Sequence, residues 1–201
     1  MPKKHILGDY HYRRAKEIGY RSRSALKLRE IFSKHRIVRK GDVVLDLGAA
    51  PGGWLQVARE YVGEKGLVVG VDLARIAPLP FNNVVLIQGD ITSPATVEKI
   101  AEVLPKPVDA VLSDVAPKFT GIHDLDHARQ IHLARVSLRV AEHFLKDGGH
   151  AVFKVLMGRE FHDFLKELQK HFSEAITVKP RASRPSSAEV YVVCKGFKRM
   201  D

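Results

Sequence analysis

The clearest chemical signal in this sequence lies between residues 43 and 54. The segment reads Val43-Val44-Leu45-Asp46-Leu47-Gly48-Ala49-Ala50-Pro51-Gly52-Gly53-Trp54, an apolar run followed by a glycine turn and a helix start, which is typical of nucleotide sites. Asp46 supplies an acceptor and Pro51 lacks an N–H group, whereas a phosphate at a helix start requires donors and positive charge. The segment therefore predicts a nucleotide-like ligand without a phosphate.

Further acids follow the next apolar runs of the chain. They are Asp72 in Val71-Asp72-Leu73, Asp90 in Gly89-Asp90-Ile91, and Asp114. Asp72 stands where an acid that binds ribose hydroxyls is expected after a first strand and helix, and Asp90 is suited to an adenine amino group. A single acid at such a place is often only a helix cap. The series favours a ligand site.

The glycine spacing argues against a dinucleotide. A nicotinamide or flavin site has G-x-G-x-x-G, whereas this chain has Gly48-x-x-x-Gly52-Gly53. S-adenosylmethionine fits better, because it has no phosphate and carries a sulfonium and an ammonium that acidic and carbonyl groups favour.

A second chemical signal is Lys154 in Ala151-Val152-Phe153-Lys154-Val155-Leu156. In a strand covered on both faces, an unpaired charged lysine costs several kcal/mol. The alternative is a lysine at a strand end whose amine reaches water. We expect Asp114, at the end of the preceding strand, to be its partner.

The elements that must position these residues alternate between strand and helix after residue 41, which predicts a Rossmann-like α/β fold with a mostly parallel sheet and helices on both faces. Strands are predicted at 42–46, 67–72, 84–88, 109–113, 149–156, 175–179 and 189–195. Helices are predicted at 53–62, 94–104, 125–145 and 160–171, with Asp147-Gly148-Gly149 ending the long one. Residues 179–187 read as a flexible basic loop that includes Pro180 and Pro185.

The positive charge is concentrated in the first fifth of the chain. Residues 1–40 hold 13 Lys and Arg against 3 acids, while residues 41–201 hold 20 of each. Ala15 to Phe32 has helical spacing, with Ile18, Ala25, Leu28 and Phe32 on one face. We interpret residues 1–40 as a basic helical extension of the domain formed by residues 41–201 and expect it to bind nucleic acid phosphates. A solvated basic tail is the alternative.

Length and composition set the remaining expectations. A chain of 201 residues suits one domain, and Cys194, the single cysteine, favours a reducing compartment. Without an apolar stretch that could span a bilayer or a signal peptide, we expect a cytoplasmic protein with no membrane partner. His123-Asp124-Leu125-Asp126-His127 resembles a metal cluster, but Asp124 serves equally well at a helix start, and we expect no metal.

Five motifs together resemble the FtsJ (RrmJ) family of ribosomal RNA 2′-O-ribose methyltransferases, which depend on S-adenosylmethionine. They are Arg21-Ser22-Arg23-Ser24-Ala25-Leu26-Lys27-Leu28, Asp46 to Trp54, Ser113-Asp114-Val115-Ala116-Pro117, Val152-Phe153-Lys154-Val155 and Ser187-Ala188-Glu189-Val190-Tyr191. They occur in the family's order, and the resemblance extends from about Tyr12 to Gly196. It implies a stand-alone member with a seven-stranded sheet in which the last strand is antiparallel.

The resemblance also implies residue roles. Lys27, Asp114, Lys154 and Glu189 become a catalytic tetrad in which Lys154 takes the proton of the ribose hydroxyl, which is a poor nucleophile until it is placed in line and relieved of that proton. The cofactor contacts become Gly52, Trp54, Asp72, Asp90 and Asp114, to which the glycine loop and the acids add Asp46, Gly48, Gly53, Leu73 and Ile91.

The expected substrate is a uridine in large-subunit ribosomal RNA, free or in the large ribosomal subunit, and the protein is expected to be a monomer. Phosphates would be held by Arg13, Arg14, Lys16, Arg21, Arg23, Arg181 and Arg184. Lys118 departs from the family, which commonly has asparagine there, and adds a cation at the rim of the site. Two alternatives stay open, namely methylation of a transfer RNA anticodon loop and an RNA-binding assembly factor without catalysis.

Overall fold

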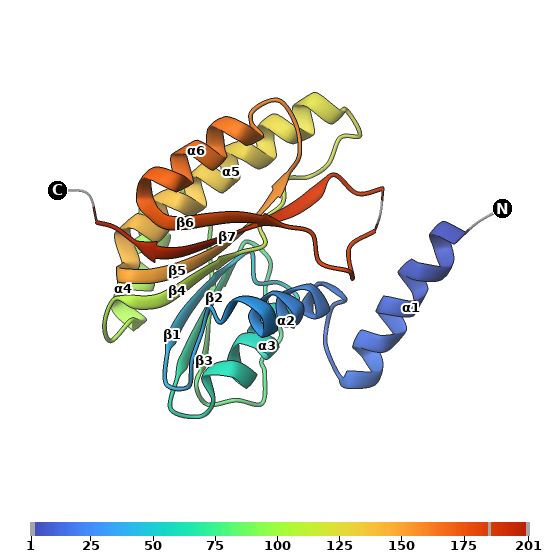
Figure 1. Cartoon of the computed structure of the whole chain (residues 1–201). Helices are drawn as coiled ribbons and strands as arrows, with labels where there is room; N and C mark the ends of the chain where they lie inside the picture. The colour runs from blue at the N-terminus through green and yellow to red at the C-terminus, as the bar shows by residue number, and fades with distance from the viewer. Residues whose placement is uncertain (1–2, 185, 200–201) are drawn as a thin grey trace.

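The architecture is a single seven-stranded sheet with helices on both faces (Figure 1). The computed structural model describes residues 3–184 and 186–199. Its helices are α1 (Lys3–Ile18), α2 (Ser24–His35), α3 (Gly53–Val62), α4 (Pro94–Val103), α5 (His123–Phe144) and α6 (Phe161–His171). Its strands are β1 (Val43–Leu47), β2 (Leu67–Asp72), β3 (Val84–Gln88), β4 (Val108–Ser113), β5 (Leu145–Leu156), β6 (Phe172–Val178) and β7 (Glu189–Phe197).

The strand order places the predicted site at a reversal of the sheet. The order is β3-β2-β1-β4-β5-β7-β6, with parallel pairing from β3 to β5 and β7 inserted antiparallel between β5 and β6. The order reverses between β1 and β4, and in open α/β sheets ligands bind beyond the carboxyl ends of strands at such a point. The predicted fold class and the antiparallel last strand are thereby confirmed.

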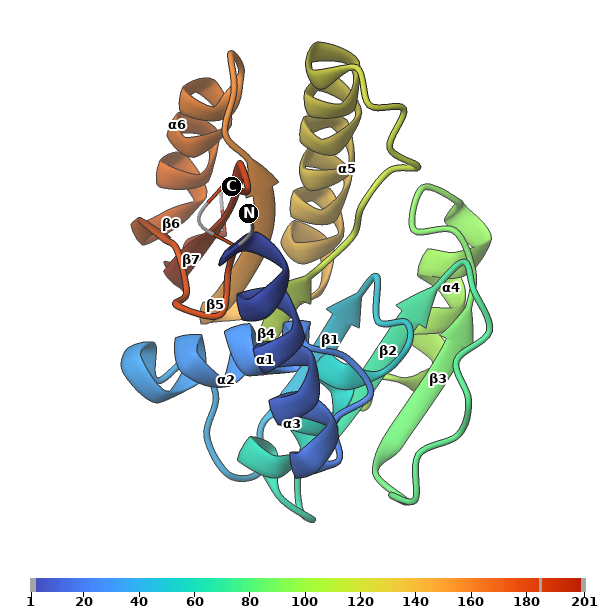
Figure 2. The same ribbon diagram turned by 90° about the vertical axis from the view of Figure 1, so that its right-hand side faces the viewer.

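Two apolar cores hold the layers together. On one face, α2 and α3 bury residues such as Leu28, Phe32 and Leu55 against the sheet. On the other face, α4, α5 and α6 bury residues such as Ile131 and Phe164. Figure 2 shows α1, α2 and α3 on one side of the sheet and α4, α5 and α6 on the other. Because Ala15 and Tyr20 belong to the first core together with α2, the basic N-terminal segment is packed against the domain from residue 15 onward.

The predicted helix spanning residues 15–32 is wrong as one element. Gly19 has φ +88°, and the N–H of Tyr20 donates to the carbonyl oxygen of Ala15 at 2.8 Å, so α1 ends there and α2 starts at Ser24. Tyr20 is buried, and its hydroxyl donates to Glu60 Oε2 at 2.7 Å. Ile18, expected on the apolar face, is 37% exposed, because the break turns it away from the core.

The boundary after α5 also differs from the prediction. The helix ends at Phe144, before Asp147-Gly148-Gly149, because the buried Leu145 already pairs with Val108 and begins β5. In the same way, the buried Phe172 starts β6 three residues before the predicted 175. In both cases an apolar side chain directly after a helix continues into the sheet, which periodicity does not reveal.

Residues 179–187 connect β6 to β7 without helix or strand in their described part, in line with the loop predicted there. Pro185, which contributed to that prediction, lies outside the described residues. The N–H of Arg181 donates to Glu30 Oε2 at 2.8 Å, so the first part of this loop is hydrogen-bonded to α2. Over the part of the chain that the structure describes, no helix is long and apolar enough to cross a membrane.

Candidate active site

The glycine loop after β1 crosses directly over the segment that follows β4. Gly48 has φ +75°, and a Cβ atom there would lie 2.7 Å from the backbone nitrogen of Val115 and 2.8 Å from its Cα. Asp114 N donates to the carbonyl oxygen of Leu47 at 2.9 Å. Because backbone atoms of Val115 cannot move aside as a flexible side chain can, only glycine fits at position 48. The loop and Asp114 are thereby brought together.

Asp46 is the most unusual group of the site. Its side chain is fully buried, and neither carboxylate oxygen has a hydrogen-bond partner among the described residues. Burial raises the pKa of Asp46 well above its ordinary value, and the charges of Asp114 and Asp72 raise it further. A buried carboxyl group without a partner lowers the stability of the fold unless a hydrogen-bond donor or a cation pairs with it. A ligand ammonium at the carboxyl end of β1 would satisfy it.

Asp72 ends β2, Asp90 lies two residues after the end of the neighbouring β3, and both border one hollow. Asp72 accepts from the N–H groups of Ala50 at 2.9 Å and Ala74 at 2.7 Å, so it holds the glycine loop. Asp90 Oδ1 accepts from both the N–H and the hydroxyl of Thr92 at 2.8 Å, and these bonds lower the pKa of Asp90. The hollow, of about 110 Å³, is lined by Gly48, Val71, Asp72, Leu73, Gly89, Asp90, Ile91, Val115, Ala116 and Leu133. Five residues predicted to contact the cofactor therefore share this hollow.

Gly53 and Trp54 lie apart from the hollow, on the side of the loop that faces α2. Trp54 is 2% exposed, its Nε1 donates to the carbonyl oxygen of Ser24 at 3.1 Å, and its ring centroid lies 5.8 Å from that of Tyr191. A Cβ atom on Gly53 would lie 2.1 Å from Ser22 Oγ. The Trp54 side chain is thus part of the core beneath the site and is not among the residues that line the hollow, and its contact with the cofactor stays a prediction.

Arg21, predicted to bind RNA, donates hydrogen bonds to the glycine loop and to the segment after β2. Its Nη1 donates to the carbonyl oxygens of Pro51, at 3.3 Å, and Ala77, and its Nη2 donates to that of Pro78 at 2.6 Å. Gly52, with φ +109°, packs beside this guanidinium. Phosphate binding by Arg21 stays a prediction, while the structure shows that it cross-links two loops at the site. Sequence periodicity gave no sign of this, because the partners are backbone carbonyls.

Replacing Arg21 with methionine is therefore expected to weaken cofactor binding. Loss of a charged donor from three carbonyls loosens the glycine loop, and we expect the Kd for S-adenosylmethionine to rise about tenfold, equivalent to about 1.4 kcal/mol. Calorimetric titration measures this. Arg13→Met, which removes an exposed arginine on α1, is the matched control and should bind the cofactor normally. Equal cofactor affinities for the two variants would contradict the loop role.

Lys154 and Asp114 form the predicted pair at the carboxyl ends of β5 and β4. Lys154 is 8% exposed, and its Nζ donates to the carbonyl oxygen of Asp114 at 2.6 Å and lies 3.0 Å from Asp114 Oδ1. Burial raises the pKa of Asp114, and the positive charge and hydrogen bond of Lys154 oppose this shift without cancelling it. The amine is held at a defined position by a group on the neighbouring strand.

Lys27 and Glu189 form a second ion pair from α2 and the start of β7. Burial acts to raise the pKa of Glu189, but the charges of Lys27 and Lys154 and the hydrogen bonds from Lys27 and Tyr191 outweigh it, and the pKa is lowered. The influence of Lys154 on Glu189 and of Lys27 on Asp114 shows that the two pairs are electrostatic neighbours. All four residues of the expected tetrad thus gather in one place.

Tyr191 supports this cluster and was not singled out in the sequence. It is fully buried, its hydroxyl donates to Glu189 Oε1 at 2.9 Å, and Lys27 Nζ lies 5.7 Å from the centroid of its ring. Burial, followed by the charges of Asp114 and Glu189, raises the pKa of Tyr191 well above its ordinary value. The signal available was its position two residues after Glu189, which places both side chains on one face of a strand.

Most of the other cations predicted to bind RNA lie at the surface. Arg13, Arg14 and Lys16 are exposed on α1, and Arg181 and Arg184 are exposed in the loop before β7. Arg14 Nη1 lies 3.4 Å from Glu17 Oε2. Figures 1 and 2 both place α1 on the side of the molecule to which this loop extends. Arg23 is half-buried and acts electrostatically on Tyr191, and Lys118 is exposed after β4.

The histidine-rich segment at the start of α5 serves the fold. Asp126 accepts from the N–H groups of Thr120 at 2.8 Å and Gly121 at 2.9 Å, and His127 Nε2 accepts from the N–H of Glu160 at 3.0 Å. Asp124 and Asp126 both lie in the first turn of α5, where a negative charge is favourable, and Asp126 in addition holds the segment that precedes the helix. Within residues 3–184 and 186–199, no three His, Cys, Asp or Glu side chains are grouped so as to hold a metal ion.

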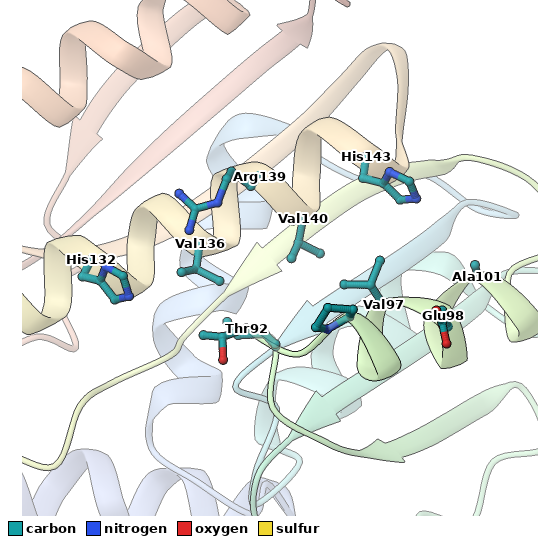
Figure 3. Close-up of a pocket in the computed structure, with 11 residues that line it drawn as sticks. Thr92, Val97, Glu98, Ala101, His132, Val136, Arg139, Val140 and His143 are labelled. Atoms are coloured by element: carbon teal, nitrogen blue, oxygen red, sulfur yellow. The ribbon is translucent and has the colours of Figure 1, made fainter.

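A larger cavity, of about 690 Å³, opens between α4 and α5 and was not predicted. Figure 3 shows His132, Arg139 and His143 on the α5 wall, facing Val97 and Glu98 of α4. None of the residues that line it carries a buried polar atom without a partner in the described structure. By contrast, Asp46 and Asp114, at the carboxyl ends of β1 and β4, both carry such atoms, and the site chemistry is concentrated there.

The sheet order and the antiparallel β7, together with the family match and the solved methyltransferase structure reported below, place the chain in the class of S-adenosylmethionine-dependent methyltransferases. Within that class, the chain belongs to the family of FtsJ-like methyltransferases, which matches residues 20–197.

Individual relatives agree with this assignment. The chain is 54% identical over 187 residues to a ribosomal RNA large subunit methyltransferase E of Methanothrix thermoacetophila, covering 93% of this chain and 72% of that protein. It is 45% identical over 192 residues to the protein of the same name from Methanocaldococcus jannaschii, covering 94% and 78%. Among solved structures, a ribosomal RNA methyltransferase from Plasmodium falciparum is 32% identical with a TM-score of 0.79, covering 90% of this chain and 100% of that one. A fibrillarin from Aeropyrum pernix with bound S-adenosyl-L-methionine, 20% identical, shares the fold with a TM-score of 0.61 over 87% and 75% of the two chains.

Proposed function

We propose that this enzyme transfers a methyl group from S-adenosylmethionine to the ribose 2′-hydroxyl of a uridine in large-subunit ribosomal RNA. The observation that carries the proposal is the gathering of Lys154, Asp114, Lys27 and Glu189 beside the glycine loop. The reaction requires an amine that can accept the hydroxyl proton, held next to a site for a cationic cofactor. The amine of Lys154 lies in such a position, at the carboxyl ends of the strands. The names of the relatives favour ribosomal RNA as substrate.

The residues present fit S-adenosylmethionine. The buried, unpartnered oxygens of Asp46 suit its ammonium, and the hollow bordered by Asp72 and Asp90 suits its ribose and adenine. Bound at this place, the cofactor supplies an electrophilic methyl group on a sulfonium. Gly48 lets the loop lie directly against the Val115 backbone at the edge of the hollow, and Leu73 and Ile91 contribute apolar walls to the hollow. Gly52 and Gly53 allow Arg21 and Ser22 to support the loop.

Lys154 is the residue that accepts the proton of the ribose hydroxyl in this proposal. Its Nζ is fixed by the carbonyl and carboxylate oxygens of Asp114, which also stabilise the ammonium formed when the proton arrives. Glu189 neutralises Lys27, and the Tyr191 hydroxyl restrains Glu189. The tetrad thereby holds one proton acceptor in a fixed geometry, which raises the rate when the hydroxyl is placed in line.

Residues 1–40 are proposed to act as part of the same domain and to hold the RNA, together with the loop at 179–187. Support comes from the packing of α2 into the core shared with α3 and from the exposed cations on α1. We propose further that the protein acts in the cytoplasm, as a monomer, on ribosomal RNA or on the large ribosomal subunit.

The decisive experiment supplies labelled S-adenosylmethionine to the protein with ribosomal particles, free ribosomal RNA and transfer RNA, and then maps the methylated nucleotide. We expect label on one ribose 2′-oxygen of large-subunit RNA. Label on a transfer RNA anticodon loop would replace the substrate, and absence of label from every RNA would favour a binding or assembly factor.

Salt is expected to separate the two binding events. Each phosphate contact releases counterions, so the affinity for single-stranded RNA should fall with a log–log slope of about −0.7 per contact, whereas cofactor binding at the partly enclosed strand ends should change little. Titrations of both ligands over a salt series measure the two slopes. Similar slopes for RNA and cofactor would contradict the assignment of RNA to the basic surface.

A further inference from the structure

The pairing between β4 and β5 ends directly before Asp114 and Lys154. The last paired residues of β4 and β5 are Ser113 and Phe153, so their successors Asp114 and Lys154 lie just beyond the ladder. On its other side β5 stays paired with β7 as far as Leu156. The backbone of Lys154 is therefore held from one side only, unless something replaces the missing connection to β4.

A side chain of α5 makes that connection. Gln130 is fully buried, and its Nε2 donates to the carbonyl oxygens of Val115 and Lys154, both at 3.1 Å. The two hydrogens of a primary amide suffice for two acceptors, and facing two carbonyls fixes which end of the amide points toward the strands. Gln130 thus bridges the segments that carry Asp114 and Lys154.

A second observation distinguishes Gln130 from an ordinary core contact. Its Oε1 is buried without a partner among the described residues. Such an atom costs stability, and an apolar side chain of similar size would avoid that cost. About two turns further along the same helix, Ser137 joins α5 to β4 through a hydrogen bond with Ser113 Oγ at 2.9 Å, so the amide of Gln130 is not the only polar contact between this helix and β4 in the described structure.

We propose that Gln130 is a positioning residue for methyl transfer, whose amide closes the gap between β4 and β5 and so sets the backbone of Lys154 against Asp114. This inference rests on the proposed function. Gln130 touches neither the reacting atoms nor the hollow, and it acts through the Lys154 carbonyl. Displacement of a catalytic group by about 1 Å can cost about 100-fold in rate, so the bridge is expected to affect turnover much more than binding.

The test compares Gln130→Met with Ser137→Ala. Methionine has nearly the length of glutamine but no donors. Ser137→Ala removes a buried side-chain contact between the same helix and Ser113 of β4, and it leaves the two carbonyl oxygens that Gln130 bridges with their donor. We expect kcat of Gln130→Met to fall about 100-fold, with the Kd for S-adenosylmethionine and the KM for RNA within about twofold of wild type. The pH dependence of kcat should also move, while Ser137→Ala keeps the wild-type kcat and profile.

Two further measurements keep the proposal open to refutation. If Gln130→Met does not fold, Gln130→Asn retains an amide one methylene shorter and should lie between wild type and inactive protein. Titration of the Lys154 Cε resonance in isotope-labelled protein, assigned with Lys154→Met, reports the surroundings of the amine without any turnover, and it should differ between wild type and the Gln130 variant. A wild-type protein that methylates no RNA overturns the proposed function, whereas an unchanged Lys154 titration, or an unchanged kcat and pH profile in an active enzyme, overturns the role of Gln130.

Discussion

Replacing Lys154 with alanine is expected to lower the rate of methyl transfer by about 1,000-fold or more, while the Kd for S-adenosylmethionine stays within about threefold of wild type. Lys154 Nζ is the acceptor held by Asp114 at the ends of β5 and β4, and it does not line the hollow assigned to the cofactor. Single-turnover transfer of label to RNA measures the chemical step, and calorimetry measures cofactor binding.

Two controls separate chemistry from packing in that experiment. Lys154→Met keeps most of the stem that fills the core but has no amine, so it should be as inactive as the alanine variant. Lys118→Ala removes an exposed lysine after β4 and should leave the chemical step unchanged. Retention of most of the turnover by either Lys154 variant would remove Lys154 from the role of proton acceptor.

Replacing Asp46 with asparagine is expected to weaken S-adenosylmethionine binding by about 30-fold, equivalent to about 2 kcal/mol for the loss of a charged acceptor. The carboxylate is buried and without a partner in the described structure, so a bound ammonium is the group that would satisfy it. Calorimetric titration measures the change. Asp90→Asn is the comparison, because the Asp90 carboxylate is already bonded to Thr92.

The same substitution is expected to stabilise the protein without ligand. Folding raises the pKa of Asp46, so between its ordinary value near 4 and its raised value the unfolded chain releases the proton first, and stability falls as pH rises. Asparagine cannot titrate. The melting temperature of the variant should therefore exceed that of wild type at neutral pH and approach it below about pH 4. Excess cofactor should raise the wild-type melting temperature more than that of the variant.

A variant that melts lower than wild type at neutral pH and still binds the cofactor normally would contradict both expectations. It would mean that Asp46 stabilises the fold and makes no contribution to the ligand. Opposite changes in stability and affinity are the mark of a group kept for binding at a cost to folding.

Local sequence patterns were sufficient to predict much of the fold and part of the site. Strands β2 and β3 and helix α3 have the bounds predicted from apolar runs and turn residues. The pair of Lys154 and Asp114 followed from two neighbouring strand ends and the cost of a buried amine, and the structure confirms it. The break at Gly19 and the start of β5 at Leu145 were missed, because each depends on where one side chain, Tyr20 or Leu145, is buried in the core.

By itself, the sequence determined the alternation of strands and helices and the acidic glycine loop that begins at Asp46 and suits a ligand without phosphate. It also determined the buried lysine and the concentration of positive charge before residue 41. These depend on residue type and on spacing within a few turns or one strand. The tertiary structure decided which distant groups meet: Lys27 with Glu189, Arg21 with the glycine loop, Trp54 with the core, and Gln130 with the ends of β4 and β5. Those contacts arise from the strand order and the insertion of β7 beside β5, and no local periodicity encodes the order in which strands pair.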